Sequence, residues 1–113
     1  MAVYANNIVI NSGESFSQPL TILDSNSPTP LDLNGYTALS MMRKHVDSSV
    51  KTAQFNVDII NPSDGLITIS LASSVTSSID EGRYVYDVLL ISPSNYKSIV
   101  VEGSVLVRAG ISS

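Results

Sequence analysis

The chain has 113 residues and a net charge of −4, with six Lys or Arg, ten Asp or Glu and no Cys. This length buries a substantial core, so the sequence predicts one domain over residues 1–113. The lack of a basic run argues against nucleic acid as a partner, the lack of Cys excludes disulfides and thiolate chemistry, and no stretch approaches the ~18 apolar residues of a membrane span, so no membrane insertion is expected.

Apolar residues recur at nearly every second position and turn residues separate the runs, which predicts an all-β fold of about seven strands. The first expected strand covers residues 3–10 and the second covers 15–23, which ends at a Ser-Asn-Pro loop. Asn34-Gly35 leads into a third strand at 36–44, because Asn-Gly tolerates the positive φ that such turns require.

The second half of the chain continues the pattern. Asn61-Pro62-Ser63-Asp64-Gly65 makes a tight reversal between two alternating runs, which is the clearest hairpin in the sequence. Residues 72–79 are expected to form at most one short helical turn. The remaining expected strands cover residues 54–60, 66–71, 83–92 and 97–108.

The charged fraction is unusual. Asp, Glu, Lys and Arg make up 14% of the chain, against about 25% in typical soluble domains. Ser, Thr and Asn replace them, in runs at residues 24–30 and 73–78. A neutral, hydroxyl-rich surface reduces charge repulsion between packed subunits and so suits a member of an assembly, although a Ser-rich soluble protein fits the composition as well.

One motif specifies the type of β fold. Asp80, Gly82 and Tyr84 form a D-x-G-x-Y corner that enters an alternating strand, as at the E–F corner of immunoglobulin-like sandwiches. The Tyr84 hydroxyl is therefore expected to bond to backbone a few residues upstream. Tyr86 occupies the place where antibody domains carry a cysteine. The predicted fold is a single immunoglobulin-like antiparallel β-sandwich.

Six segments in the same order and spacing carry a wider resemblance. They are GESF at 13–16, LDLNGYTA at 31–38, MRK at 42–44, DGLITISL at 64–71, EGRYVYDV at 81–88 and VEGSV at 101–105. Together they are similar to the amino-terminal domain of phage baseplate upper proteins and to related phage structural proteins. No single segment is diagnostic, since such hairpins and corners occur in many sandwiches.

The resemblance implies a non-enzymatic structural protein of a bacteriophage virion, located in the particle. It implies docking onto other virion proteins, as a baseplate or tail adaptor, and a homo-oligomeric or assembly-bound state. It carries over no catalytic residue, cofactor or metal ligand. The chain departs from baseplate proteins in having no coiled coil or receptor-binding module behind this domain, so a capsid decoration subunit is equally compatible.

The strand pattern also indicates an interface. In an immunoglobulin arrangement the third, sixth and seventh strands share one sheet, and aligning the third strand on the family pattern turns Ala38, Ser40 and Met42 inward. The outer face would then expose an unusually apolar set. Its members are Leu39, Met41, Val85, Leu89, Ile91, Val100 and Leu106.

Two alternatives to this interface stay open. Residues 1–11 or 46–53 would cover the face within the same chain, or a register shift of one residue would exchange the two faces. The uncharged first strand is itself a candidate for pairing with a neighbour's sheet, or it is simply strand A of its own sandwich.

Other ligand sites have less support. Tyr96, in the turn after Pro93, is a candidate platform for a carbohydrate. His45 has no nucleophile or Cys placed near it by any motif, so no enzyme activity is expected. The only metal alternative is a Ca²⁺ held by Asp64 together with Asp80 and Glu81, should the fold bring them to one end.

Overall fold

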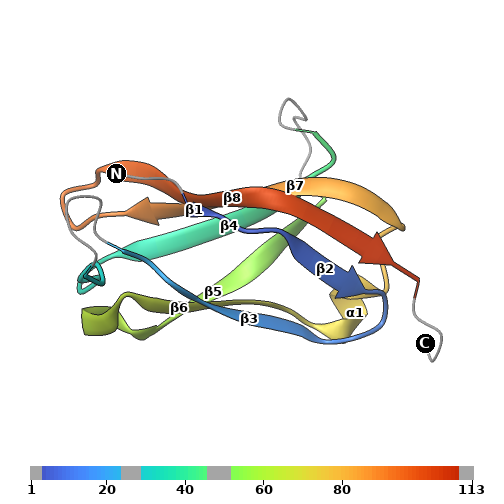
Figure 1. Cartoon of the computed structure of the whole chain (residues 1–113), viewed down its shortest axis with the longest axis horizontal. Helices are drawn as coiled ribbons and strands as arrows, with labels where there is room; N and C mark the ends of the chain where they lie inside the picture. Colours follow the sequence, from blue (N-terminus) through green and yellow to red (C-terminus); the bar gives the residue numbers. More distant parts are fainter. Residues whose placement is uncertain (1–3, 24–28, 46–51, 110–113) are drawn as a thin grey trace.

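The structure is a computed structural model, and it describes residues 4–23, 29–45 and 52–109 (Figure 1). Its strands are β1 (Tyr4–Ala5), β2 (Ile8–Asn11), β3 (Phe16–Thr21), β4 (Thr37–Arg43), β5 (Ala53–Asn61), β6 (Leu66–Leu71), β7 (Gly82–Ile91) and β8 (Lys97–Arg108). A 3-10 turn, η1 (Pro62–Asp64), follows β5, and a short helix, α1 (Ser73–Thr76), follows β6. The predicted all-β fold is confirmed, and β6 and β8 have the predicted bounds.

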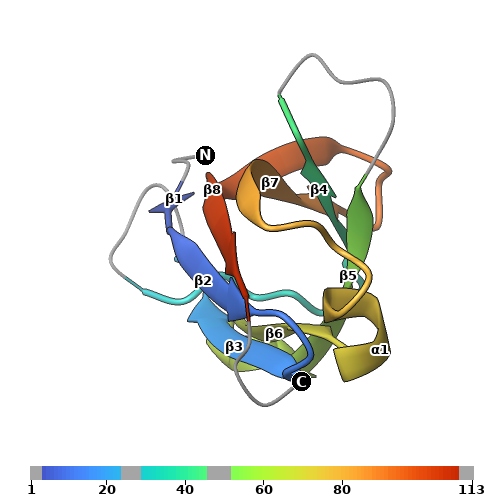
Figure 2. The ribbon, with the colours of Figure 1, turned by 90° about the vertical axis from the view of Figure 1, so that its right-hand side faces the viewer.

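The strands form two layers that share β5 (Figure 2). The order is β1-β8-β7-β4-β5-β6-β3, with β2 also paired to β8. The first three residues of β5 pair with β4 and those from Asn56 onward pair with β6, so this strand passes from one layer to the other. The layers make an immunoglobulin-like sandwich in which β4, β7 and β8 are neighbours, as predicted.

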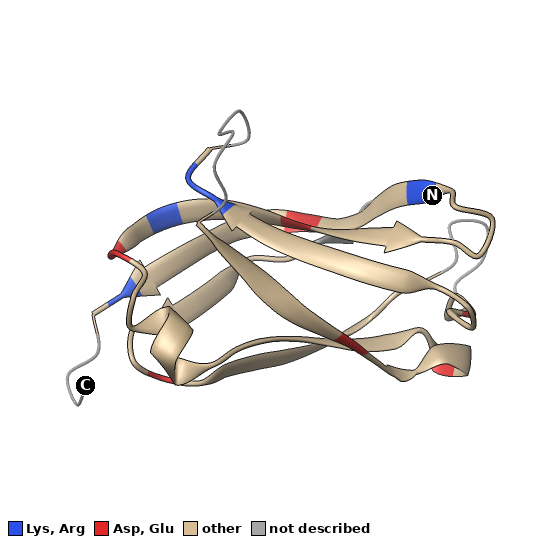
Figure 3. Cartoon of the chain, turned by 180° about the vertical axis from the view of Figure 1, so that it is seen from behind, with Lys and Arg blue, Asp and Glu red and all other residues tan. Residues whose placement is uncertain are grey.

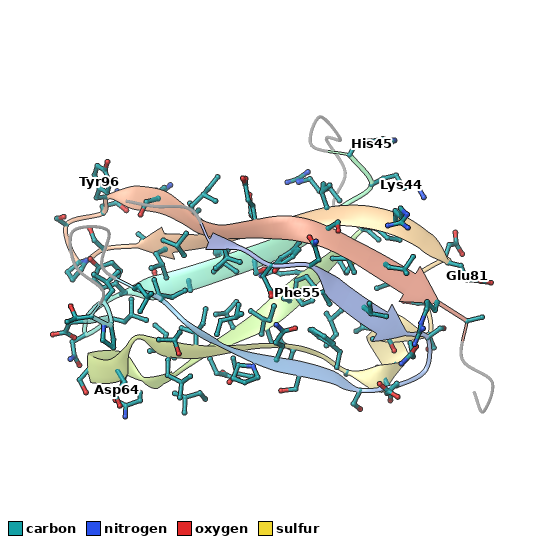
Figure 4. All side chains as sticks on the ribbon, viewed as in Figure 1. Lys44, His45, Phe55, Asp64, Glu81 and Tyr96 are labelled. Atoms are coloured by element: carbon teal, nitrogen blue, oxygen red, sulfur yellow. The ribbon has the colours of Figure 1, made fainter. Side chains whose placement is uncertain are left out.

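Alternation along the strands builds the core between the layers. In β7, for example, Tyr84, Tyr86, Val88 and Leu90 are buried while the residues between them are not. Phe55 lies at the centre (Figure 4), with its ring centroid 5.9 Å from that of Phe16 and 5.7 Å from that of Tyr86. These side chains join β3, β5 and β7 across the sandwich.

The predicted corner is confirmed. The Tyr84 hydroxyl donates to the carbonyl oxygen of Asp80 at 2.7 Å, and Gly82 between them has a φ of 146°, a conformation that favours glycine. The ammonium of Lys44 lies 4.7 Å from the centroid of the Tyr84 ring. Burial, reinforced by Asp80, raises the pKa of the Tyr84 hydroxyl, so it stays protonated and able to donate.

The first predicted strand is divided in two at Asn6 and Asn7. The Tyr86 hydroxyl donates to the carbonyl oxygen of Asn6 at 2.8 Å and accepts from its side-chain amide at 3.1 Å. Gly103 allows the backbone at Asn6 to pass close over β8, because a Cβ on Gly103 would overlap the Asn6 carbonyl. We call this place the Asn6 crossing. Both β1 and β2 run parallel to β8, so this segment is a strand of its own sandwich.

The short helix has a structural role. Thr76 is fully buried, where its hydroxyl oxygen lies 2.9 Å from the Glu14 carbonyl and accepts from the Gly13 amide at 3.1 Å. These bonds fix the β2–β3 turn against α1. The predicted helical turn within residues 72–79 is thereby confirmed.

Removing the corner hydroxyl with Tyr84→Phe should lower the free energy of unfolding by about 1 kcal/mol, the usual net contribution of one hydrogen bond. Urea unfolding measures the change. Tyr96→Phe is the matched control, since that tyrosine is 71% exposed and its hydroxyl should contribute little. Equal effects of the two substitutions would contradict the corner's role.

Gly103→Ala should displace the Asn6 crossing and expose the amides of β2 to hydrogen exchange, because the added Cβ meets backbone. Tyr86→Phe removes only the hydroxyl contacts at the same place, so it should cost about 1 kcal/mol and leave β2 largely protected. Hydrogen exchange followed by mass spectrometry compares them. Full protection of β2 in Gly103→Ala would show that the crossing tolerates a side chain.

Candidate interaction surface

The sheet of β4, β7 and β8 has one side packed on the core and one side turned outward. The outward side chains, which we call the outer face, are Thr37, Leu39, Met41, Arg43, Arg83, Val85, Asp87, Leu89, Ile91, Lys97, Ile99, Glu102, Ser104, Leu106 and Arg108. Cross-strand pairing aligns them in rows. Leu89 pairs with Leu39 on one side and Ile99 on the other, so an aliphatic row crosses all three strands.

The prediction for Val100 is wrong. Val88 pairs with Val101 but Leu89 pairs with Ile99, which makes Val100 an extra residue in β8. Both Val100 and Val101 are buried, at 1% and 0% exposure, and Ile99 takes the outward place at 42%. A bulge of this kind shifts the alternation by one residue. The apolar run Ile99-Val100-Val101, which strict alternation does not allow, was the available signal.

The other predicted members lie on the outer face. Leu39 is 38% exposed, while their neighbours half-bury the remaining five, Met41, Val85, Leu89, Ile91 and Leu106. Val9, 51% exposed and paired with Leu106, extends the face onto β2. Within the described residues, β1 and β2 pair along the edge of β8 (Figure 2). Of the other predicted cover, residues 46–53, the part from 46 to 51 lies outside the described residues, and Ala53 is the first residue of β5.

The outer face is hollowed beside the bulge. The hollow has a volume of about 540 Å³ and is lined by Met41, Arg43, Val85, Asp87, Ile99 and Glu102. Tyr86 of β7 and Gly103 of β8 also contribute to its lining. Asp87 and Glu102 are direct cross-strand partners. Figure 3 shows how few charged positions the ribbon carries. Two carboxylates side by side are therefore a local exception, and we call this place the acidic hollow.

Asp87 is influenced by both of the other charged groups in the hollow, Arg43 and Glu102. Burial raises the pKa of the Asp87 carboxyl, Arg43 on β4 acts to lower it and Glu102 on β8 to raise it. The Arg43 guanidinium lies against Met41, with Nη2 3.8 Å from the sulfur. The hollow thus combines two carboxylates and one guanidinium with the aliphatic walls of Val85 and Ile99.

Tyr96, the candidate carbohydrate platform, lies at one end of the sandwich (Figure 4). It is 71% exposed, and the hairpin turn holds its backbone. The Ser92 amide donates to the Tyr96 carbonyl at 2.9 Å, and the Tyr96 amide donates to the Ser92 hydroxyl at 3.0 Å. The ring is presented on a fixed turn, as the carbohydrate alternative requires.

The structure contradicts the Ca²⁺ alternative. Asp64 lies in η1 at one end of the sandwich and Glu81 at the other (Figure 4), so Asp80 and Glu81 do not meet Asp64. Nowhere in residues 4–23, 29–45 and 52–109 are three His, Cys, Asp or Glu grouped to hold a metal ion. His45 follows β4 and is exposed. None of the helices in these ranges has the length and apolar character needed to span a membrane.

No family model matches the sequence, and no curated protein matches it. A solved structure described as "Structural basis of T cell specificity and activation by the bacterial superantigen toxic shock syndrome toxin-1" contains a chain with a similar fold. The TM-score is 0.50 at 16% identity, over 90% of this chain and 92% of that one. At this identity the likeness supports the fold alone.

Two further structures are similar at lower TM-scores and do not inform the function. A Listeria monocytogenes internalin-like protein gives 0.45 at 12% identity, over 96% of this chain and 28% of that one. A family 123 glycoside hydrolase from Clostridium perfringens gives 0.44 at 10% identity, over 100% of this chain. This chain spans 24% of the hydrolase chain.

Asp87→Asn should stabilise the protein near neutral pH. The folded-state pKa of Asp87 lies above its ordinary value of 3.8, so its contribution to stability is present below about pH 3.8 and is lost as the pH rises through the raised pKa. The amide lacks this penalty. Its advantage in urea unfolding should appear at about pH 7 and vanish at about pH 3.

Asp58→Asn, the same change at an exposed position of β5, is the control and should not reproduce this pH-dependent gain. A destabilised Asp87→Asn at neutral pH would mean that attraction to Arg43 outweighs the burial of the carboxylate.

Proposed function

We propose that this protein is a non-enzymatic interaction protein of a bacteriophage virion, which docks onto other virion proteins as a baseplate or tail adaptor through its outer face. The aliphatic row of Leu39, Leu89 and Ile99 carries the proposal. Antiparallel sheets with one solvated side normally alternate apolar and polar residues. Here the side away from the core presents a continuous apolar row as well.

The exposure of that row supports a contact surface. Leu39 and Ile99 are 38% and 42% exposed, and a second apolar pair on the same face is formed by Val9 of β2 and Leu106 of β8. Contiguous exposed apolar surface on a soluble domain marks interaction sites. Burying such side chains against a partner contributes roughly 25 cal/mol for each Å² removed from water.

The low charge of the chain and its resemblance to phage structural domains supply the virion context. A surface rich in Ser, Thr and Asn packs against neighbours with little charge repulsion. The same properties suit a capsid decoration subunit, which remains the alternative position in the particle. No catalytic arrangement is needed for either role.

Ile99→Asp should reduce incorporation of the protein into phage particles at least tenfold, because it places a charge at the most exposed position of the aliphatic row. Quantitative immunoblotting of purified particles against total lysate measures incorporation. Asn56→Asp adds the same charge at an exposed position of β5 and should incorporate normally. Normal incorporation of Ile99→Asp would show that the outer face is not the docking surface.

Gold-labelled antibody on intact particles then distinguishes the positions. Label at the tail tip supports an adaptor, and label over the head supports a decoration subunit. Particles without label, and without the protein in their mass spectrum, would contradict the virion proposal.

Carbohydrate binding is a second candidate because Tyr96 is exposed on a fixed turn. If it is the function, Tyr96→Ala should abolish binding on a glycan array while Ile99→Asp retains it. A Tyr96→Ala variant that enters particles normally and a wild-type protein that binds no glycan would together exclude this candidate.

A further inference from the structure

The acidic hollow is the most specific feature of the outer face. Its walls are apolar, formed by Met41, Val85 and Ile99, and two carboxylates lie among them. Asp87 and Glu102 are paired directly across β7 and β8, where like charges repel. Arg43 is the cation that acts on Asp87, so the lining retains an excess of one negative charge when both carboxylates are ionised.

This combination is complementary to a basic side chain. Arg and Lys carry a long aliphatic stem and a charged head, and they bury the stem along apolar surface. In the hollow the stem would lie between Val85 and Ile99, and the head would reach Asp87 and Glu102. A guanidinium fits best, since its planar donors match carboxylate oxygens.

A second copy of the chain is a poorer occupant of the same place. A two-fold axis running along β7 would stack the outer faces and bring Asp87 opposite Asp87 of the other copy. This charge repulsion favours a different, basic partner surface.

We infer that the acidic hollow binds an Arg or Lys side chain presented by a partner protein, flanked by apolar residues that cover the aliphatic row. The inference rests on the proposed docking role of the outer face and names the chemistry of its partner.

The test uses acetyl-Leu-Arg-Leu-amide as a probe, titrated into the ¹⁵N-labelled full chain at neutral pH and low salt. Acetyl-Leu-citrulline-Leu-amide has the same shape without the charge and is the matched ligand control. The arginine peptide should shift the amide resonances of Val85 to Asp87 and of Glu102 and Gly103. The citrulline peptide should bind at least tenfold more weakly.

Asp87→Asn combined with Glu102→Gln should weaken binding of the arginine peptide about tenfold, a change of about 1.4 kcal/mol. Asp58→Asn removes a carboxylate from another face and should bind as the wild type does. Thermal unfolding of each variant verifies that it is folded. Retained affinity in the double variant would overturn the inference.

Two other outcomes would also overturn it. Equal binding of both peptides would make the hollow merely apolar, and resonance shifts that appear on raising the protein concentration alone would make a second copy the occupant. If the arginine peptide fails while Ile99→Asp still blocks incorporation into particles, the docking role stands and only the basic partner is wrong.

Discussion

The contact of Phe55 with Phe16 and Tyr86 holds the two layers of the sandwich together. Many immunoglobulin domains use a disulfide and a tryptophan at this place, and this chain has neither. Here three packed aromatic rings hold the layers together instead. Dispersion attraction between the rings and the burial of their apolar surface take the place of a covalent link. Because β5 belongs to both layers, Phe55, its last residue paired with β4, fixes their relative position.

Tyr86 transmits this constraint to the rest of the molecule. Its ring packs on Phe55 while its hydroxyl holds Asn6 over Gly103, so the same residue orders the core and the edge of the sheet. With Tyr86 turned inward, the period of the strand turns Val85 and Asp87 outward. The acidic hollow is therefore a consequence of core packing, and its lining residues are held by strands instead of loops.

Most of the fold could be predicted from the two-residue period of apolar side chains along the strands and from local turn residues. The corner at Tyr84, the hairpin at Asp64-Gly65 and the neighbouring positions of β4, β7 and β8 depend on local chemistry or on a regular pattern. The bulge at Val100 depends on which residue of β8 pairs with Leu89. Such pairing is decided by tertiary packing, and single-chain periodicity cannot distinguish the two registers.

The candidate site was predicted in part for the same reason. Six of its seven apolar members lie on the outer face, but Ile99 replaced Val100. Asp87 and Glu102 lie in consecutive strands joined by the turn at residues 92–96, but their direct pairing depends on the bulge at Val100. Arg43 joins them only through the pairing of β4 with β7, two strands that are far apart in sequence. The separation of Asp64 from Glu81, in contrast, was deducible, since β6 carries the chain from one end of the sandwich to the other.

The parallel pairing of β2 with β8 has a mechanical consequence. Because the two strands are parallel, the start of β2 and the end of β8 lie at opposite ends of their shared ladder, in which four successive residue pairs join them, from Ile8 with Val105 to Asn11 with Arg108. A force that pulls the two ends apart runs along both strands and perpendicular to their hydrogen bonds. It loads the bonds together, in shear, whereas an antiparallel terminal pair pulled from one end would open them one at a time. Rupture therefore requires all of them to yield at once, an arrangement suited to a part that bears tension.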